Sequence, residues 1–416
     1  MRVLITTQVF PPEIHPSARI VLELATALNE AGHEVTVATG FPHHPHGRLP
    51  AGHAKRWLSR ETVNGVRIVR GWHFTSPSAS IPVRGLVYVS QAIGTAFAAL
   101  ASGRPDVVIN FGPPLVGPCL SLFLAKRFRV PHVPVIYDLY PDVAVETGAV
   151  RSETIIRLSR MAERWVYRGS SRIVVLSEGF RRTLVERKGV PAGKVRVIPV
   201  WIDAEEIHRP ADAGAWRKSW NIPPESFVVL YAGTIGLVSG AEIMLEVAKR
   251  WVDTPGVLFL FVGAGRTKEN VRKRAGGLPN VRFLDFQPRE ELSRMLAAAD
   301  VGVVTLLPGR GRTSVPSKML GYMAVELPVI ASCDENSDSA AMVRESGCGE
   351  TVPAGDAAAI SGALGRFHAD RPYCRRAGKL GRDFLVSRNS REVGVKAFHA
   401  LLEEFAGSGA NATIRA

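Results

Sequence analysis

Short apolar strands alternate with helical segments along both halves of the chain, and this rhythm restricts the fold more than any other feature. In the first half, strands are expected at Arg2–Phe10, Glu34–Thr39, Val66–Arg70, Val107–Phe111, Val133–Asp138 and Ile173–Ser177. In the second half, they are expected at Phe227–Ala232, Val257–Val262, Val281–Leu284, Val301–Leu306 and Val329–Ser332. Because strands that alternate with helices form parallel sheets with helical crossovers, the sequence predicts an α/β protein.

Helices are expected between these strands, at Ala18–Glu30, Ala241–Val252, Arg289–Ala299, Lys318–Ala324 and Val393–Phe405. Prolines interrupt regular structure around residues 199–223, where we expect the seam between two doubly wound, Rossmann-like domains. The expected domains are 1–200 and 201–388. Residues 389–416 are expected to form a terminal helix, packing back toward the first domain, and a loose tail.

Basic residues are concentrated in the first half of the chain, although the whole chain has a net charge of +14. Residues 1–200 hold 25 Lys and Arg against 13 Asp and Glu, whereas the remainder holds 27 against 25. An acidic partner is therefore expected to meet the first half alone. Charge by itself leaves nucleic acid, anionic lipid headgroups and a phosphorylated substrate open.

The composition is that of an ordinary globular protein, with 46% hydrophobic and 22% charged residues. Four cysteines without CxxC spacing disfavour both a disulfide scaffold and a zinc ribbon. The apolar run before Pro11 is too short for the core of a signal peptide. We therefore expect a cytoplasmic protein.

Two uncharged windows of 19 residues raise the question of a membrane. Val107–Ala125 contains three prolines and two glycines, so it cannot be one helix. Gly85–Gly103 is moderately apolar, and three readings stay open: a spanning helix, an interfacial helix and a buried crossover helix. Two basic groups suit either lipid headgroups or a solvated surface: Lys55-Arg56, and Arg181, Arg182, Arg187 and Lys188.

Glycine-rich loops follow two of the expected strands in the second half, at the strand ends where open parallel sheets bind ligands. One loop contains Gly233, Thr234 and Gly236, and the other contains Gly263 and Gly265. Glycines let a ligand approach the backbone, and free N–H groups before a helix favour phosphate. Either loop alone could be a plain tight turn, but the two together favour a phosphate site.

A third loop offers two arginines, hydroxyl groups and a lysine at the start of the helix Lys318–Ala324. Its candidate residues are Arg310, Arg312, Ser314, Ser317 and Lys318. Such a set can hold a diphosphate without a metal ion. A serine cap flanked by solvated arginines is the alternative. The chain has no Asp-x-Asp motif, so a carboxylate-bound metal is not expected.

Polar residues also follow strands of the first half. Asp138 is the candidate for acid–base or electrostatic work because it lies where a strand becomes a loop, and Asp142 follows it. In the first strand–helix loop, the residues expected to face a cleft are Glu13, His15, Arg19 and Ser17, the last also a possible helix cap. His43 begins a segment with three histidines, where prolines and the lack of a nearby carboxylate disfavour a metal site.

These landmarks together resemble the family-4 retaining glycosyltransferases, whose GT-B fold has two Rossmann-like domains facing across a cleft. The resemblance covers nearly the whole chain and is strongest to bacterial sugar transferases of O-antigen, capsule and colanic acid assembly, including the fucosaminyltransferase type. It is carried by Phe10-Pro-Pro-Glu13, Gly40-Phe-Pro42, Asp138-Leu-Tyr-Pro141, Val175-Leu-Ser-Glu-Gly-Phe180, Tyr231-Ala-Gly-Thr-Ile-Gly236, Pro316-Ser-Lys-Met-Leu-Gly-Tyr-Met-Ala324 and Pro328-Val-Ile-Ala-Ser332.

The resemblance implies an acceptor site in the first domain and a nucleotide-sugar site in the second. The residues expected on the acceptor side are Glu13, His15, Ser17, Arg19, His43 and Asp142. It places the diphosphate on Gly233–Gly236 and Ser317-Lys318. Tyr322 of the same helix is also expected to contact the donor. It places the nucleoside against Gly263–Gly265, Phe286, Gln287 and Pro288. Asp138 falls at or beside the position where many relatives carry a catalytic histidine, whose usual slot is Tyr137 here. The leaving diphosphate then helps to deprotonate the acceptor, so no protein nucleophile is required.

Two departures from the family pattern bear on the site. The broader family has two glutamates separated by seven residues, and their slots here are Thr313 and Gly321. A basic residue that many relatives carry after the first glycine loop is replaced by Leu237-Val238-Ser239. We expect Lys318, Arg310 and Arg312 to supply its charge.

The sequence therefore predicts a metal-independent hexosyl- or N-acetylhexosaminyltransferase that uses a nucleotide-sugar, with UDP as the expected carrier. The expected acceptor is a polyprenyl-diphosphate-linked saccharide at the inner face of the cell membrane, which accounts for the basic first half. Nucleic acid is not expected, since no recognised binding module is present. Two alternatives are a nucleotide-sugar epimerase of the same fold and a non-catalytic basic scaffold or nucleic-acid-binding protein.

Overall fold

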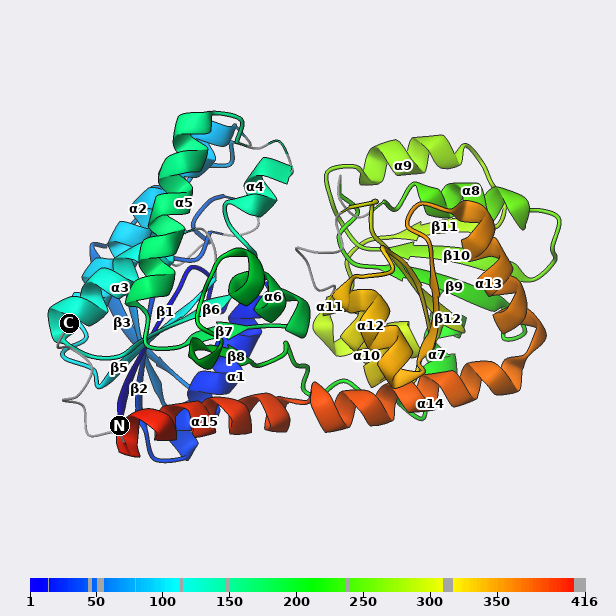
Figure 1. Ribbon diagram of the computed structural model, residues 1–416. Coiled ribbons are helices and arrows are strands. Elements are labelled where there is room, and N and C mark those ends of the chain that lie inside the picture. The colour runs from blue at the N-terminus through cyan, green and yellow to red at the C-terminus, as the bar shows by residue number, and fades with distance from the viewer. Residues whose placement is uncertain are drawn as a thin grey trace. The chain divides into compact units, whose positions relative to one another are not determined.

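The computed structural model describes residues 1–407 except 14, 44–46, 51–55, 79, 113–114, 147, 149, 237–239 and 310–316. The chain divides into two compact units (Figure 1). The first unit is Met1–Pro199 with the C-terminal helix from Gly394 onward, and the second unit is Val200–Val393.

The first unit is built on an eight-stranded sheet. Its elements are β1 (Arg2–Thr7), α1 (Pro16–Glu30), β2 (Glu34–Gly40), β3 (Leu58–Val63), β4 (Val66–Gly71), α2 (Ile81–Leu100), β5 (Val107–Phe111), α3 (Val116–Phe128), β6 (His132–Ile136), α4 (Asp142–Glu146), α5 (Glu153–Gly169), β7 (Ile173–Val175), α6 (Glu178–Arg182), the short helices η1 (Thr183–Arg187) and η2 (Ala192–Lys194), β8 (Val195–Val197) and α15 (Arg391–Gly407).

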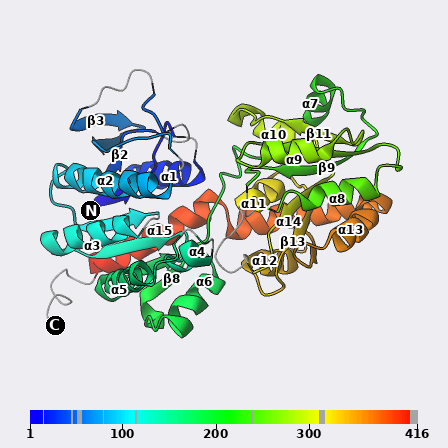
Figure 2. The ribbon, with the colours of Figure 1, turned by 90° about the horizontal axis from the view of Figure 1, so that it is seen from above.

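The strands of this sheet lie in the order β3-β4-β2-β1-β5-β6-β7-β8, and only the β3–β4 pair is antiparallel among these neighbours. The chain passes from β1 to β2 on one side and later crosses to β5 on the other side. Because such crossovers are right-handed, α1 covers one face of the sheet, and α2, α3 and α5 cover the other. Figure 2 shows α2, α3 and α5 next to one another. The carboxyl ends of β1 and β5 form the switch point of the sheet.

The hairpin of β3 and β4 was not predicted from the strand–helix rhythm. Asn64 and Gly65 join the two strands with φ angles of 50° and 76°. Two consecutive residues with positive φ are typical of a type I′ turn, for which Asn-Gly is a preferred sequence. The signal was therefore present in the sequence as this dipeptide between two short strands.

The uncharged window Gly85–Gly103 lies mostly in α2, which packs against the sheet through a very close backbone approach. A Cβ at position 94 would lie 2.1 Å from the carbonyl oxygen of Trp72, so only glycine fits there. The helix is therefore a crossover helix of an α/β layer. Within the described residues, α2 is the one helix long and apolar enough to cross a membrane, and 28% of its apolar window is buried. The window Val107–Ala125 is not one helix, as predicted: it holds the predicted strand β5 and most of α3, a helix that was not predicted.

The second unit is built on a six-stranded parallel sheet in the order β11-β10-β9-β12-β13-β14. Its elements are α7 (Ala213–Ser219), β9 (Phe227–Ala232), α8 (Ile243–Arg250), β10 (Val257–Val262), α9 (Lys268–Ala275), β11 (Val281–Leu284), α10 (Arg289–Ala297), β12 (Val301–Thr305), α11 (Ser317–Ala324), β13 (Val329–Ser332), α12 (Asp338–Ser346), β14 (Gly349–Val352), α13 (Ala357–Ala369) and α14 (Arg371–Arg388).

Both faces of this second sheet are buried. Side chains of β10 alternate between two cores: Phe259 and Phe261 pack with α8, α9 and α13, while Leu260 and Val262 pack with α10, α11 and α12. This two-sided burial is why the strand is apolar at every position. The order of the strands reverses between β9 and β12, so the switch point lies at their carboxyl ends.

The predicted α/β fold with two parallel sheets is confirmed, but several element ends differ. The strands predicted to run to Phe10, Asp138, Ser177 and Leu306 end at Thr7, Ile136, Val175 and Thr305. In the first case, Thr7 pairs with Phe111, the last residue of β5, so the ladder between these two strands ends there. The C-terminal helix is longer at both ends than the predicted Val393–Phe405.

Candidate active site

The two glycine loops of the second unit pack on each other at the carboxyl ends of β9 and β10. The amide of Gly233 donates to Val262 O at 2.9 Å, and a Cβ at Gly263 would lie 2.0 Å from the carbonyl oxygen of Gly233. A Cβ at Gly265 would lie 2.1 Å from Ile235 O. Gly263 and Gly265 therefore serve the contact between the loops. The contact of these glycines with a ligand stays a prediction.

Lys318 lies over the first glycine loop, near the switch point of the sheet. Its Nζ is 4.1 Å from the centroid of the Tyr231 ring, and a Cβ at Gly233 would lie 3.6 Å from Lys318 Cε. The Tyr231 hydroxyl donates to Thr234 O at 3.0 Å, which fixes the ring below the ammonium group. The structure thus brings Lys318, Gly233 and Thr234 together, as a phosphate site requires.

Tyr322 does not reach the surface of the unit. Its side chain is fully buried, and its hydroxyl accepts a hydrogen bond from the Ala232 amide at 2.9 Å. The prediction that Tyr322 contacts a donor is therefore wrong as a direct contact. The residue instead anchors the end of β9 and so positions the loop that contains Gly233 and Gly236.

The expected nucleoside residues follow β11. Phe286 is 59% exposed, Gln287 Nε2 donates to Asp285 O at 3.0 Å, and Pro288 is the N-cap residue of α10. The sequence reasoning missed Lys268 beside them. Its Nζ lies 2.6 Å from Asp285 Oδ1 and lowers the pKa of that carboxyl. The exposed Phe286 ring gives the site a surface on which a base can stack.

Three expected diphosphate ligands, Arg310, Arg312 and Ser314, lie outside the described residues, and so does the side chain of Ser317. The chain just before them is held in place. The Gly309 amide donates to both carboxylate oxygens of Asp334, at 3.1 and 2.9 Å. Asp334 follows β13, so this contact ties the loop after β12 to the neighbouring strand end.

In the first unit, Asp138 lies just beyond β6 in a small cavity. Other residues that line this cavity include Gly112, Tyr137, Tyr140 and Tyr167. Burial among these groups raises the pKa of Asp138 from 3.8 to about 6. A carboxyl group that changes its charge near neutral pH can exchange a proton or stabilise a developing positive charge. The neighbouring Tyr137 has a strongly buried hydroxyl, and burial raises its pKa as well.

Asp142 and Lys188 form a partly buried ion-pair network with Glu163. Lys188 Nζ lies 2.7 Å from carboxylate oxygens of both Asp142 and Glu163. Lys188 therefore serves the interior of the unit, which corrects its assignment to the basic surface group. Asp142 was predicted to face an acceptor, and its pairing gives it a second role in holding α4 against α5.

Glu13 is almost completely buried between two loops. Its carboxylate accepts hydrogen bonds from the Phe10 amide at 3.2 Å and the His43 amide at 3.0 Å, and it lies 3.4 Å from His43 Nδ1. The prediction that Glu13 faces an acceptor is therefore corrected: it ties the loop after β1 to the loop after β2. His43 remains partly exposed beside it.

The residues at the start of α1 make local contacts. His15, not Ser17, is the N-cap: its Nδ1 accepts from the Ser17 amide at 3.3 Å and lies 2.7 Å from Ser17 Oγ. Arg19 Nε donates to Glu23 Oε1 at 2.6 Å, one turn further along the helix. These contacts fix the loop after β1 at the sheet edge where the candidate acceptor residues lie.

A second cavity lies at the switch point of the first sheet, between α2 and α3, and shares Gly112 with the cavity around Asp138. Three buried polar side chains in its wall have an atom without a hydrogen-bond partner: Gln91 Oε1, Thr95 Oγ1 and Asn110 Oδ1. The Gln91 and Asn110 amide nitrogens already donate to Gln8 and Thr6. The Gln91 and Asn110 carbonyl oxygens can therefore accept from a hydroxyl group, and the Thr95 hydroxyl can both donate and accept. Sequence reasoning missed these residues, because only the tertiary structure brings them together.

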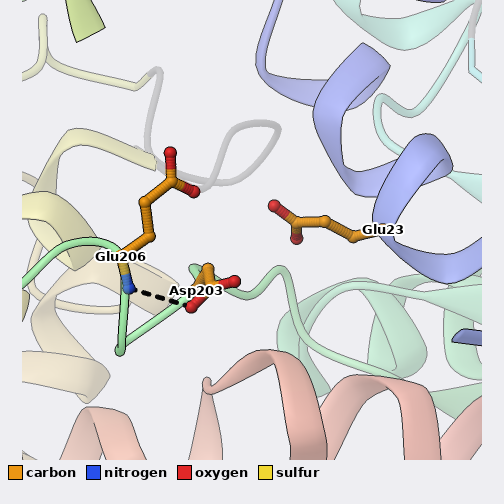
Figure 3. A group of neighbouring side chains, drawn as sticks. All are labelled: Glu23, Asp203 and Glu206. Carbon is orange, nitrogen blue, oxygen red and sulfur yellow. Dashed lines mark hydrogen bonds between the residues drawn. The ribbon is translucent and has the colours of Figure 1, made fainter. Parts of the chain in front are cut away.

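Carboxylates at the start of the second unit are held by amides and arginines. Asp203 accepts from the Glu206 amide at 3.0 Å (Figure 3). It also accepts from the Glu205 amide at 3.1 Å and pairs with Arg391 at 3.1 Å. Glu206 pairs with Arg289 at 2.6 Å. Their charges are therefore balanced within this unit.

Two family models match the chain, one in each unit. The model described as a glycosyl transferase 4-like domain matches residues 17–201. The model described as glycosyl transferases group 1 matches residues 226–370. The first match includes Asp138, and the second includes the glycine loops and Lys318.

Whole-chain comparisons agree with these matches. The Escherichia coli K12 protein WcaI, named as a colanic acid biosynthesis glycosyl transferase, is 27% identical over 334 residues, which are 78% of this chain and 81% of that protein. Sucrose-phosphate synthase from Thermosynechococcus elongatus has a TM-score of 0.76 at 21% identity, covering 98% of this chain and 100% of that chain. Anabaena HepE in complex with UDP-glucose has a TM-score of 0.68 at 15% identity, covering 97% of this chain and 100% of that chain.

The fold and the paired matches define a two-domain enzyme of sugar transfer. The chain is a glycosyltransferase with the GT-B fold. This confirms the predicted fold and the predicted class of enzyme.

Proposed function

We propose that this glycosyltransferase transfers a sugar from a UDP-sugar to a polyprenyl-diphosphate-linked saccharide, with retention of the anomeric configuration and without a metal ion. The bond between the anomeric carbon and the diphosphate oxygen breaks, and the acceptor hydroxyl oxygen forms the new bond on the same face. The hydroxyl proton passes to the leaving diphosphate, which is released as UDP. The acceptor places the enzyme on the inner face of the cell membrane.

The observation that carries the donor part of the proposal is Lys318 over the Gly233 loop. An ammonium group at a strand end and helix start supplies a fixed positive charge for a diphosphate. Phe286 adds an exposed ring for the base. HepE, which shares this fold, has been solved with UDP-glucose. A nucleotide diphosphate-sugar therefore suits the chemistry of this edge of the second sheet.

The acceptor part is supported by the first unit. Asp138 lies in a cavity beside hydrogen-bond acceptors that have no partner, an arrangement that suits the hydroxyl groups of a saccharide. As an ionised group, Asp138 can stabilise the positive charge that develops on the sugar ring. The basic excess of residues 1–200 suits the diphosphate of a lipid carrier.

The direct test is transfer from radiolabelled UDP-sugars to a synthetic polyprenyl-diphosphate-linked monosaccharide, with EDTA present. We expect label in the lipid fraction for one donor, and an anomeric proton coupling in the product that matches the donor. Conversion of the UDP-sugar to its epimer in the absence of acceptor would contradict a transferase and favour an epimerase. Label transfer that requires a divalent metal would contradict the metal-free part of the proposal.

A further inference from the structure

The outward face of α2 is apolar along most of its length. From position 85 to position 100, every residue of α2 that is exposed to solvent is glycine or apolar. The large side chains among them are Leu86, Val89, Ile93, Phe97 and Leu100. Their spacing of three or four residues places them in one stripe, with Phe97 62% exposed. A helix that faced only water would carry polar residues at these positions.

Helix α5 continues this apolar surface. Its exposed large apolar residues are Ile155, Leu158, Met161 and Trp165, again spaced as one stripe. Phe123 of α3 is also exposed, and α3 lies between α2 and α5 in the same layer (Figure 2). Lys126 of α3 lies 5.2 Å from the centroid of the Trp165 ring, which joins α3 to α5. We call the exposed residues of these three helices the docking face.

The docking face is bordered almost entirely by positive charge. The exposed cations within the three helices, with the C-cap residue of α3, are Arg84, Lys126, Arg127, Arg129, Arg157, Arg160, Arg164 and Arg168. The helices themselves, all within the described residues, contain two acidic residues, and Glu153 alone of these is exposed. In α5 the arginines flank the apolar stripe, so apolar and cationic side chains meet the same partner surface.

We propose that the docking face binds the surface of an anionic lipid bilayer, with the stripes of α2 and α5 inserted at the level of the headgroups. Arginine side chains beside the stripes pair with anionic headgroups, while Phe97 and Leu158 enter the acyl boundary. The helix α2 lies along the surface and does not span the bilayer, because its opposite face is packed on the sheet at Gly94. This inference rests on the proposed function, in which the acceptor is a membrane lipid.

A second copy of this chain is a poorer partner for this face. A two-fold interface joins the same patch on both subunits, so the eight cations of one copy would meet the eight of the other. Like charges placed together across an interface oppose association. An anionic bilayer offers the opposite charge and an apolar interior in one surface.

The test is sedimentation with vesicles of phosphatidylcholine alone and of phosphatidylcholine with phosphatidylglycerol. We expect wild-type protein to bind the anionic vesicles at least tenfold more tightly, and added salt to weaken binding. Two variants, Phe97→Asp with Leu158→Asp, and Arg157→Gln with Arg160→Gln and Arg164→Gln, should each lose at least tenfold in binding. The matched controls, Leu380→Asp and Arg375→Gln with Arg376→Gln and Lys379→Gln, change exposed residues of α14 and should bind as wild type does.

Equal vesicle binding by the docking-face variants and their controls would overturn the proposal. So would a wild-type dimer in gel filtration that Phe97→Asp dissociates while vesicle binding is absent. The UDP-induced rise in melting temperature is measured on the same variants and should not change. If UDP fails to bind any of the proteins, the proposed function fails while the bilayer result stands by itself.

Discussion

At the scale of single residues, burial separates those that can meet a substrate from those that hold the site together. Lys318 and Phe286 present a charge and an aromatic ring at the edge of the second sheet. The polar atoms of Tyr322 and Glu13 instead accept hydrogen bonds from backbone amides. The sequence could predict that all four belong to loops or helices at strand ends. It could not predict their burial, because burial depends on partners such as Ala232 and His43 that are distant in the chain.

Asp138 provides a prediction that depends on pH. Its pKa is about 6 in the folded protein and 3.8 as the reference value, so folding opposes its ionisation. The free energy of unfolding therefore falls as the pH rises from about 4 through about 6. Asp138→Asn removes this loss, because the amide has no charge to bury. At pH 8 the variant should be more stable than wild type by up to about 3 kcal/mol in urea unfolding, with a much smaller difference near pH 4.

The ionisation of Asp138 should also set the pH dependence of kcat/KM. If ionised Asp138 stabilises the transition state, kcat/KM for transfer rises as the pH passes about 6. Asp138→Asn should lose most of the activity, and its remaining kcat/KM should not show this rise with pH. Asp253→Asn, an exposed aspartate of the second unit, is the control for both experiments. A variant that is destabilised at pH 8, or that keeps the wild-type pH profile, would contradict this role.

At the scale of elements, periodicity predicted most strands and crossover helices, since a buried parallel strand is apolar at every position. The hairpin was missed because β3 is partly exposed and alternates less clearly, although β4 was predicted as a strand and Asn64-Gly65 marked the turn. The place of α2 was left open by the sequence, because an apolar window of that length fits a core as well as a membrane surface. Its packing through Gly94 and its apolar outward face emerge only from the fold.

The close approach of α2 to the sheet gives a test at this scale. In Gly94→Ala, the new methyl group would lie 2.1 Å from the Trp72 carbonyl oxygen, so the helix must move away. We expect a loss of about 2 kcal/mol or more in the free energy of unfolding. Gly85→Ala, in the same helix with nothing within 4 Å of the new methyl group, should gain up to about 1 kcal/mol. Equal unfolding free energies for the two variants would contradict this packing.

At the scale of the whole molecule, the two units differ in charge and hold different candidate sites. The first 200 residues hold most of the basic excess, the Asp138 cavity and the docking face, and the second unit holds the glycine loops and Lys318. The fold class was predictable because the same rhythm occurs in both halves. The donor site was predictable in part, since Gly233 and Lys318 lie beside strand ends. The packing of Gly263 and Gly265 between the two loops emerges only from the fold.

The central claim is a metal-free nucleotide diphosphate site at Gly233 and Lys318, and the most direct test is the melting temperature with and without UDP. A ligand that binds only the folded protein raises this temperature. We predict a rise with UDP that EDTA leaves unchanged. Lys318→Ala should weaken UDP binding by about ten- to a hundredfold, as expected for one charge-assisted hydrogen bond. Lys249→Ala, an exposed lysine of α8, should bind UDP as wild type does. An identical UDP shift in Lys318→Ala, or a shift that EDTA abolishes, would contradict the claim.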